Sequence, residues 1–475
     1  MKFYPLPKRG NVSEQNTRRI SVSMTIKKIL IFLFLFLSLP VSAKQTIDRF
    51  SYINLDWWKN YNDEILLEHL QTLYNNNHDL KIAELKTKQS EENVRLVGAN
   101  QLPQVGFDGS FTRTLSGPQT EFGNVIIPEY SQNELFMPLS ASYEIDIWGQ
   151  NYLNRKSAKK QKEIAEQQER ATYIYMTSVF ASNYYNLIKT DELEKTLKEI
   201  IAIQTDVVKM TEKKYNAGLA PINELLNERQ TLVRFEQDLN KVSENKKVLN
   251  NELITLLALK TDKEIEHSSF DKVSNPKTPD SLSTTIIQYR PDLICAEDYV
   301  KKTGIDVKVA RREFLPKFFL YGTLGFNAYR WNRMFSPETF LGNIGIAPSW
   351  DIFTGGAKLA RYRINKYEYK KSIEKYEKTV LTSIQEVNDA MVSVKTTKAN
   401  LIKADEAYTI EQEKHNLAEK QFTIGDSSKL DEMKSNVNLL IVKQHEISSK
   451  IDNVISTISL YNAVGGIDYT KPENL

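Results

Sequence analysis

Alternating apolar and polar positions mark two pairs of strands in the chain. After Pro103, the apolar residues Val105, Phe107 and Phe111 alternate with polar ones, and a similar alternation runs from Leu135 to Ile147. The second half of the chain repeats it with Phe318, Leu320 and Leu324, then with Ile344, Ile346, Trp350 and Ile352. A period of two is typical of strands with one apolar face. We therefore expect one hairpin over about 103–148 and another over about 316–353.

The two predicted hairpins belong to a duplicated sequence. The stretch "SYEIDIWGQ" returns as "PSWDIFTGG", and "KKYNAGLAPINELLNERQ" returns as "KQFTIGDSSKLDEMKSNV". Matching residues keep similar separations: Leu102 and Leu315 lie 213 positions apart, Asp146 and Asp351 lie 205 apart, and Gly218 and Gly425 lie 207 apart. Three blocks in the same order indicate a tandem repeat of roughly 210 residues.

Long segments without proline surround the hairpins and predict helices. The segments 150–217 and 356–424 would each be roughly 100 Å long as helices, and shorter helices are expected over about 63–100, 219–260 and 428–462. Apolar residues repeat every 3.5 positions in places, which indicates helices packed side by side; they include Ile174, Ala181, Tyr185 and Ile188, and Ile447, Ile451, Val454, Ile458 and Tyr461. The expected organisation is a first repeat over 44–260, a linker over 261–281 and a second repeat over 282–475.

The N-terminus carries the pattern of an export signal. From Met24 the chain offers two lysines, an apolar run from Ile29 to Leu39, and small residues at Val41-Ser42-Ala43 before a predicted cleavage site. The run is shorter than the roughly 20 residues that a spanning helix needs, so a retained anchor is the less favoured alternative. We expect residues 1–43 to be an extension and signal peptide. No cysteine stands at the cleavage site, so no lipid anchor is expected.

Composition narrows the classes of function. Hydrophobic residues make up 41% and charged residues 26% of the chain, which suits long exposed helices. Lys and Arg number 63 against 60 Asp and Glu, and this near balance gives no indication of a nucleic-acid partner. The single Cys295 excludes an internal disulfide. Nucleophile, phosphate-binding and metal-binding motifs are absent from the sequence, so no enzyme activity and no cofactor are expected.

The strand count decides what the strands could build. Strands of about ten residues with one apolar face, in an exported chain, are typical of transmembrane β-barrels, but an antiparallel sheet capping a helical bundle gives the same pattern. A membrane barrel must close, and single-chain barrels have at least eight strands. This chain offers four. Several copies would have to share one barrel, and a monomeric porin-like barrel is disfavoured.

The sequence resembles the TolC-like outer-membrane efflux proteins. The resemblance covers nearly all of the mature chain and rests on "DWWKNYNDEILLEHLQTLYNNNHDL", "SYEIDIWGQ", "YNAGLAPINELLNERQ", "PSWDIFTGG", "YNAVGG" and, most specifically, "RPDL" followed by "FLPKFFLYGTLG". It implies an α+β membrane protein that forms a homotrimer, with four strands per subunit in one twelve-stranded barrel in outer-membrane lipid. The helices would continue the barrel as a tunnel through the periplasm.

The same resemblance implies a function and partners. Such proteins are passive exit ducts for drugs, metals or other small molecules, driven by an inner-membrane pump through a periplasmic adaptor protein. An exit duct for type I protein secretion is an alternative within the family. A periplasmic coiled-coil protein without a pore is an alternative of another class.

The resemblance also assigns candidate sites. The periplasmic aperture of the family is lined by two acids. The first matches Asp431, and three copies of it would form a ring that favours cations. The second position holds Lys434 instead of an acid, and its charge would weaken that field. Closing contacts in some relatives correspond to Glu224, Phe422, Ser427 and, as a possible basic partner of Glu224, Lys429. The Gly218 and Gly425 turns would dock the adaptor. The turns from barrel to helix are Asp146, Trp148 and Gly149, and Asp351, Phe353 and Gly355.

Overall fold

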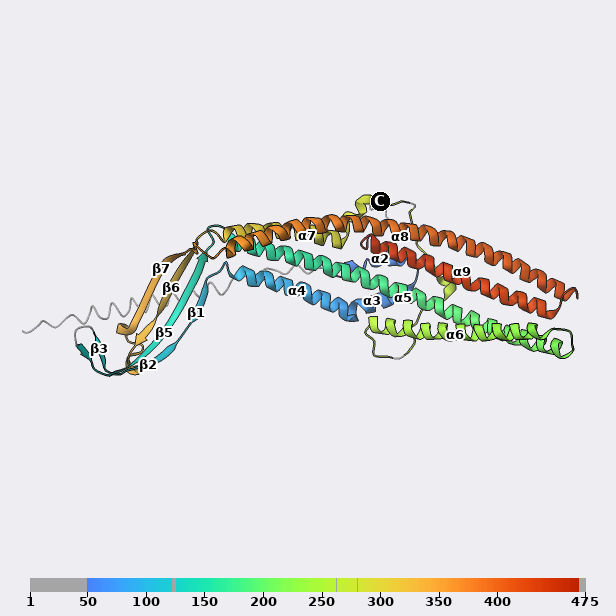
Figure 1. Ribbon diagram of the computed structural model, residues 1–475, viewed down its shortest axis with the longest axis horizontal. Helices are drawn as coiled ribbons and strands as arrows, with labels where there is room; N and C mark the ends of the chain where they lie inside the picture. Colours follow the sequence, from blue (N-terminus) through green and yellow to red (C-terminus); the bar gives the residue numbers. More distant parts are fainter. Residues whose placement is uncertain (1–48, 122–124, 262, 280, 470–475) are drawn as a thin grey trace, which may run out of the picture. The chain divides into compact units, whose positions relative to one another are not determined.

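The computed structural model describes residues 49–121, 125–261, 263–279 and 281–469 (Figure 1). These residues form long helices and one main antiparallel sheet, which confirms the predicted α+β class. The signal peptide and cleavage site predicted over 1–43 lie outside the described residues. None of the described helices combines the length and the hydropathy that a membrane-spanning helix needs.

The main sheet joins the two repeats. Its strands are β1 (Gln104–Phe107), β2 (Ser110–Ser116), β5 (Tyr130–Ile145), β6 (Lys317–Ala328) and β7 (Phe340–Ser349). Both β1 and β2 pair with β5, which pairs with β6, which pairs with β7. A separate short pair, β3 (Gln119–Glu121) and β4 (Val125–Ile127), lies in the loop of the first hairpin and was not predicted.

A proline and a glycine shape the middle of the sheet. β1 and β2 form one line of pairing along β5 that is interrupted opposite Pro138, which has no N–H to donate. On its other side Pro138 faces Gly325 of β6. A Cβ atom added at Gly325 would lie 2.3 Å from the carbonyl oxygen of Met137, so the pairing between the repeats requires glycine there.

The strand register sorts the side chains onto two faces. Apolar residues share one face, among them Val105, Phe107, Leu139, Tyr143, Leu320, Leu324, Ile344 and Ile346. Polar or small residues dominate the other, among them Gln104, Ser140, Ser142, Glu144, Lys317, Thr323, Asn343 and Ser349. Within the described residues, β1, β2 and β7 are paired along one side only. Counted as one interrupted strand, β1 and β2 bring the sheet to four strands with two open edges, which other copies of the chain can pair.

The helices show the duplication directly. The first repeat contains α3 (Glu64–Asn76), α4 (His78–Ala99), α5 (Gln150–Asn216) and α6 (Ile222–Leu256); the second contains α7 (Pro291–Arg312), α8 (Ala357–Thr423) and α9 (Lys429–Ala463). Corresponding helices have equal lengths: α4 and α7 have 22 residues, α5 and α8 have 67, and α6 and α9 have 35. The predicted tandem repeat is confirmed.

One segment predicted as a single helix is two helices. The stretch over about 63–100 breaks at Asn77, whose backbone leaves the helical conformation with φ −56° and ψ 132°. The Asn77 side chain accepts a hydrogen bond of 3.0 Å from the backbone N–H of Leu80, and it thereby caps α4. Its amide also donates to the carbonyl of Leu256, which ties the break to the end of α6.

A central hydrophobic cluster holds the helices together. The predicted seam residues of α5 are buried in it, and so are those of α9 except Ile447, which is buried elsewhere. Aromatic residues near the N-terminus, which were not predicted as core residues, also belong to the cluster. Trp57, in α2 (Leu55–Trp58), stacks on Tyr461 of α9 with 3.8 Å between ring centroids. The segment after residue 48 is thus fixed to the C-terminal end of the second repeat.

Candidate functional site

Both helical hairpins end in a glycine turn. Gly218 follows α5 with φ 69°, and Gly425 follows α8 with φ 79°. Apart from the adjoining residues of the chain, no atom of the described residues lies within 4 Å of a Cβ added at either position. The requirement for glycine is therefore the left-handed backbone conformation rather than space.

Lys434 links the two hairpins beside these turns. Its ammonium on α9 lies 2.6 Å from the carboxylate of Glu228 and 3.8 Å from that of Glu224, both on α6. Gln204 of α5 holds Glu228 in place by donating a hydrogen bond of 2.7 Å to its carboxylate. An ion pair therefore spans the first and second repeats at this end of the helices.

The predicted contact between Glu224 and Lys429 does not form among the described residues. Lys429 instead pairs with Glu432, three residues further along α9, and lies 5.1 Å from the ring centroid of Phe422. Lys429 is at the first turn of α9 and stays on its own hairpin, whereas Lys434 lies on the side of α9 that meets α6. The Ser427 hydroxyl is buried and has no hydrogen-bond partner within the described part of the chain.

Ser428 and Asp431 together cap the N-terminus of α9, with Ser428 as the N-cap residue. The backbone N–H of Asp431 donates to Ser428 Oγ at 3.3 Å, and the backbone N–H of Ser428 donates in return to Asp431 Oδ2 at 3.2 Å. The Ser428 hydroxyl also donates to Asp431 Oδ2, at 2.6 Å. This reciprocal arrangement is a capping box. The hydrogen bond from Ser428, together with the charges of Lys214 and Lys434, lowers the pKa of Asp431 below its ordinary value. The exposed carboxylate is therefore ionised at neutral pH.

Sequence reasoning missed Glu228, although a signal for it was present. Glu224 and Glu228 are four residues apart on one helix, a spacing that places both side chains on the same face. The match to the family pattern covered only Glu224. The helical spacing would have pointed to a pair of acids facing one partner.

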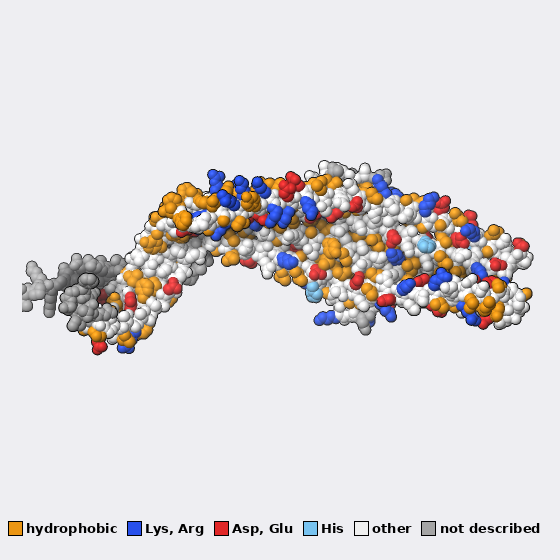
Figure 2. Space-filling model, viewed as in Figure 1, with side chains coloured by type: hydrophobic (Ala, Val, Ile, Leu, Met, Phe, Trp, Pro, Cys, Tyr) orange, Lys and Arg blue, Asp and Glu red, His pale blue; other side chains and the backbone are white. Residues whose placement is uncertain are grey.

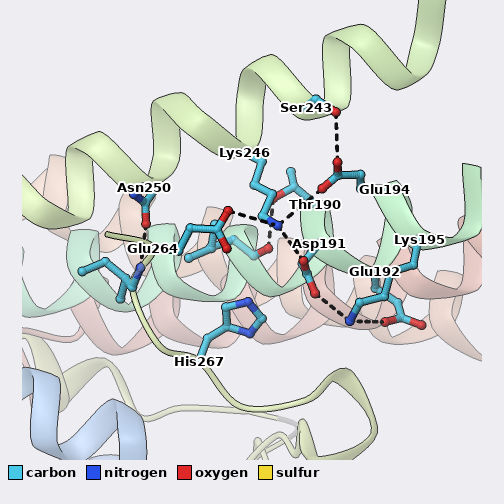
Figure 3. A network of polar contacts seen from close by, with 12 residues as sticks. Thr190, Asp191, Glu192, Glu194, Lys195, Ser243, Lys246, Asn250, Glu264 and His267 are labelled. Atoms are coloured by element: carbon cyan, nitrogen blue, oxygen red, sulfur yellow. Dashed lines mark hydrogen bonds and ion pairs between the residues drawn. The ribbon is translucent and has the colours of Figure 1, made fainter. Parts of the chain in front are cut away.

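A second polar network joins the first hairpin to the linker (Figure 3). Lys246 of α6 lies 2.8 Å from Asp191 and 3.4 Å from Glu194, both on α5, and 3.7 Å from Glu264 of the linker. Burial alone would lower the pKa of Lys246, but the hydrogen bond and charge of Asp191, together with the charges of Glu264 and Glu194, outweigh burial and raise the pKa. Asn250 accepts a hydrogen bond from the backbone N–H of Ile265. The network fixes α5, α6 and the linker to one another.

The turn from β5 to α5 is held by polar contacts. Asp146 Oδ2 accepts a hydrogen bond of 2.9 Å from the backbone N–H of Tyr152, which satisfies a donor at the start of α5. Trp148 donates from Nε1 to the carbonyl of Pro316 at 2.7 Å. Gly149 has φ 67°, and its carbonyl accepts from Arg312 of α7.

The turn from β7 to α8 uses similar contacts. The Lys358 ammonium lies 3.5 Å from the Asp351 carboxylate, and Trp350 donates from Nε1 to the carbonyl of Phe314. Gly355 has φ 58°, and the Phe353 side chain is 89% exposed. Both turns therefore contact the segment between α7 and β6. In the described residues, no group of three or more His, Cys, Asp or Glu side chains is placed to hold a metal ion.

Comparison with known proteins identifies the family. A sequence model described as "Outer membrane efflux protein" matches residues 69–259 and 282–466, with one match in each repeat. The chain belongs to the outer membrane efflux protein family. It is 26% identical over 424 residues to the probable efflux pump outer membrane protein TtgC of Pseudomonas putida, covering 86% of this chain and 84% of TtgC. It is 23% identical over 427 residues to the cation efflux system protein CusC of Escherichia coli K12, covering 88% and 90%.

Solved structures agree with the fold. The CmeC outer membrane channel of Campylobacter jejuni superposes with a TM-score of 0.79 at 23% identity and covers 90% of each chain. The outer membrane efflux proteins are outer-membrane channels that act as homotrimers and associate with a periplasmic adaptor and an inner-membrane pump. This confirms the predicted location and type of assembly. The matched relatives give no support to a protein-secretion duct or a coiled-coil protein without a pore.

Proposed function

We propose that three copies of the chain form a passive exit duct for small molecules, energised by an inner-membrane pump. The observation that carries the proposal is the sheet: it has one apolar and one polar face, two open edges, and direct continuation into helices of 67 residues. Paired edges would close a barrel with the polar face inside. Helices of that length extend it by roughly 100 Å.

The cargo is proposed from relatives and from the mechanism of a duct. The relatives are named for different cargoes: a TtgC from Pseudomonas putida for toluene, OpmQ for pyoverdine and CusC for cations. A duct that serves cargoes this different selects weakly, and the pump does most of the selection. We therefore assign this chain small molecules as a class.

The glycine-turn ends of the hairpins are the proposed periplasmic aperture. Asp431, ionised and exposed, would form a ring of three negative charges in the trimer. Lys434 turns its charge to Glu228 and Glu224, and we assign it the role of closing contact in place of Lys429. The turns at Gly218 and Gly425 remain the proposed adaptor-docking surface.

Single-channel conductance of the purified protein in a planar bilayer tests the duct and the aperture together. We expect discrete pores, and we expect Asp431→Asn to reduce their preference for cations. Asp426→Asn, which removes an equal charge from the same turn, serves as the matched control. Absence of pores from a verified membrane trimer under opening conditions would reject the duct, and equal effects of both substitutions would reject Asp431 as the selective residue.

A further inference from the structure

Basic side chains are concentrated on the helices next to the sheet. The first residues of α5 (150–162), the last of α7 (299–312) and the first of α8 (357–371) together contain sixteen Lys and Arg but only two acids, Asp306 and Glu368. Over the whole chain the two kinds are nearly balanced, at 63 and 60. Figure 2 shows this as Lys and Arg side chains gathered over the sheet-proximal part of α7 and α8. The near balance of charge over the whole chain therefore conceals a local excess of positive charge next to the sheet.

Many of these cations have no carboxylate partner. Lys156 and Lys159 of α5, Lys308 and Arg311 of α7, and Lys366 of α8 are exposed. None of them forms an ion pair or a side-chain hydrogen bond with another described residue. We call these five residues the basic band. Their charge is not neutralised within the subunit and is available to an external anion.

Lys156 and Lys366 of the band lie on the outer side of the helical layer. The helices α4, α5, α7 and α8 contact one another in that order. Lys156 precedes Ile174 by 18 residues, and Lys366 precedes Ile384 by 18 residues, so each lysine is five whole turns from its isoleucine and on the same helix face. Both isoleucines pack into the central hydrophobic cluster, which includes the segment around Trp57. The layer's other face must stay open to line a tunnel, so the covered face is the outer one.

The position along the helices matches the edge of a membrane. Lys308 lies about 6 Å from the sheet end of α7, Lys156 about 9 Å from that of α5, and Lys366 about 14 Å from that of α8, at 1.5 Å per residue. Exposed aromatic side chains, Trp148 and Phe353, occupy the turns between sheet and helices, as at membrane interfaces. Lysine side chains of this length reach a headgroup layer while their stems lie along the protein.

We propose that the basic band binds the anionic headgroups of phospholipids in the periplasmic leaflet of the outer membrane, an inference that rests on the proposed function as an outer-membrane channel. Ammonium and guanidinium groups form charge-assisted hydrogen bonds with phosphate oxygens. Clusters of several Lys and Arg beside a membrane-embedded segment attract anionic lipids, and salt screens that attraction. In a trimer, three copies of the band would surround the barrel where it leaves the membrane.

The test uses the full-length trimer in non-ionic detergent, supplied with phosphatidylglycerol or with phosphatidylcholine of the same acyl chains. Bound lipids are counted by native mass spectrometry at low and at high salt. The band variant carries Lys156→Gln, Lys159→Gln, Lys308→Gln and Lys366→Gln. The control variant removes an equal charge from exposed lysines far from the sheet, with Lys213→Gln, Lys247→Gln, Lys395→Gln and Lys398→Gln.

We expect wild type and control to prefer phosphatidylglycerol, and the band variant to lose about tenfold or more of that preference at low salt. High salt should reduce the difference in phosphatidylglycerol preference between the wild type and the band variant, because the contacts are electrostatic. Equal preference in all three proteins, or an equal loss in the control, would overturn the assignment. Conductance of the same preparations separates this result from the proposed function: pores without lipid preference overturn the lipid site alone, and a verified wild-type trimer without pores under opening conditions overturns the duct.

Discussion

Replacing Lys434 by Gln should open the periplasmic end of the channel. The substitution removes the ammonium that lies 2.6 Å from Glu228 and 3.8 Å from Glu224. The contact joins α9 to α6, so it is lost when the two hairpins separate. A shape-conserving neutral side chain removes the charge without leaving a large cavity.

The size of the effect follows from exposure. The Lys434 and Glu224 side chains are each 37% exposed and that of Glu228 is 16% exposed, so the pair is screened only in part. Exposed pairs contribute about 0–1 kcal/mol, and we take about 0.5–1 kcal/mol for this one. Three copies would then favour the closed state by about 1.5–3 kcal/mol, which corresponds to roughly a 10- to 150-fold change in the ratio of open to closed channels.

Open probability in planar bilayers measures this ratio directly. Glu228→Gln should produce a similar increase, and the double substitution should add little to either single one, because both remove the same contact. Lys434→Arg keeps the charge and should stay close to wild type. Open probabilities of Lys434→Gln and Glu228→Gln within twofold of wild type would refute the role of this ion pair in closure.

Three further substitutions or measurements test other parts of the structure. Gly325→Ala should prevent assembly of a heat-resistant trimer, judged by gel mobility, because the added Cβ meets backbone of β5 at 2.3 Å; normal assembly would contradict the register. Burial raises the pKa of Cys295 to about 12, so iodoacetamide at pH 8 should label it only after denaturation, and rapid labelling of the native protein would contradict that burial. Lys246→Met should lower the Tm at neutral pH. Burial favours the neutral form of Asp191, but its lysine partners outweigh burial and lower the pKa of Asp191 below the ordinary 3.8. The stability that Asp191 gains from Lys246 should therefore be lost only as the pH falls through the lowered pKa of Asp191. A difference in Tm between wild type and Lys246→Met that does not change with pH would contradict this contribution.

Features set by neighbouring residues could be predicted from the sequence. Period-two alternation placed both hairpins, and glycines at helix ends placed both turns, because strand faces and left-handed turns depend on local residues. The contact of Lys434 with Glu228 could not be derived in this way, since it depends on how α9 rotates against α6. The family pattern placed the basic position at Ser427, and Lys429 was the substitute predicted nearby. The break at Asn77 was missed because its flanking segments share a helical pattern, although asparagine is a preferred N-cap residue.

The burial of Trp57 against Tyr461 was also beyond local reasoning. These residues are separated by almost the whole chain, and neither segment carries a sequence pattern that predicts its contact with the other. The pairing of β5 with β6 likewise joins segments that are distant in the sequence and could not be predicted from local patterns. Its register is specified by Gly325 facing Pro138, a steric requirement that becomes visible only when the strands are placed together.

The equal lengths of corresponding helices restrict how the gene can change. Deleting one residue from α5 would turn everything beyond it by about 100° and shorten that hairpin by about 1.5 Å. Its tip would then no longer lie level with the tip of the α8–α9 hairpin, and Lys434 would face a different turn of α6. Tolerated insertions and deletions in the long helices should therefore occur in matched pairs, one in each repeat, and in multiples close to whole turns. The two repeats therefore remain coupled after duplication, since neither can change the length of its long helices without a matching change in the other.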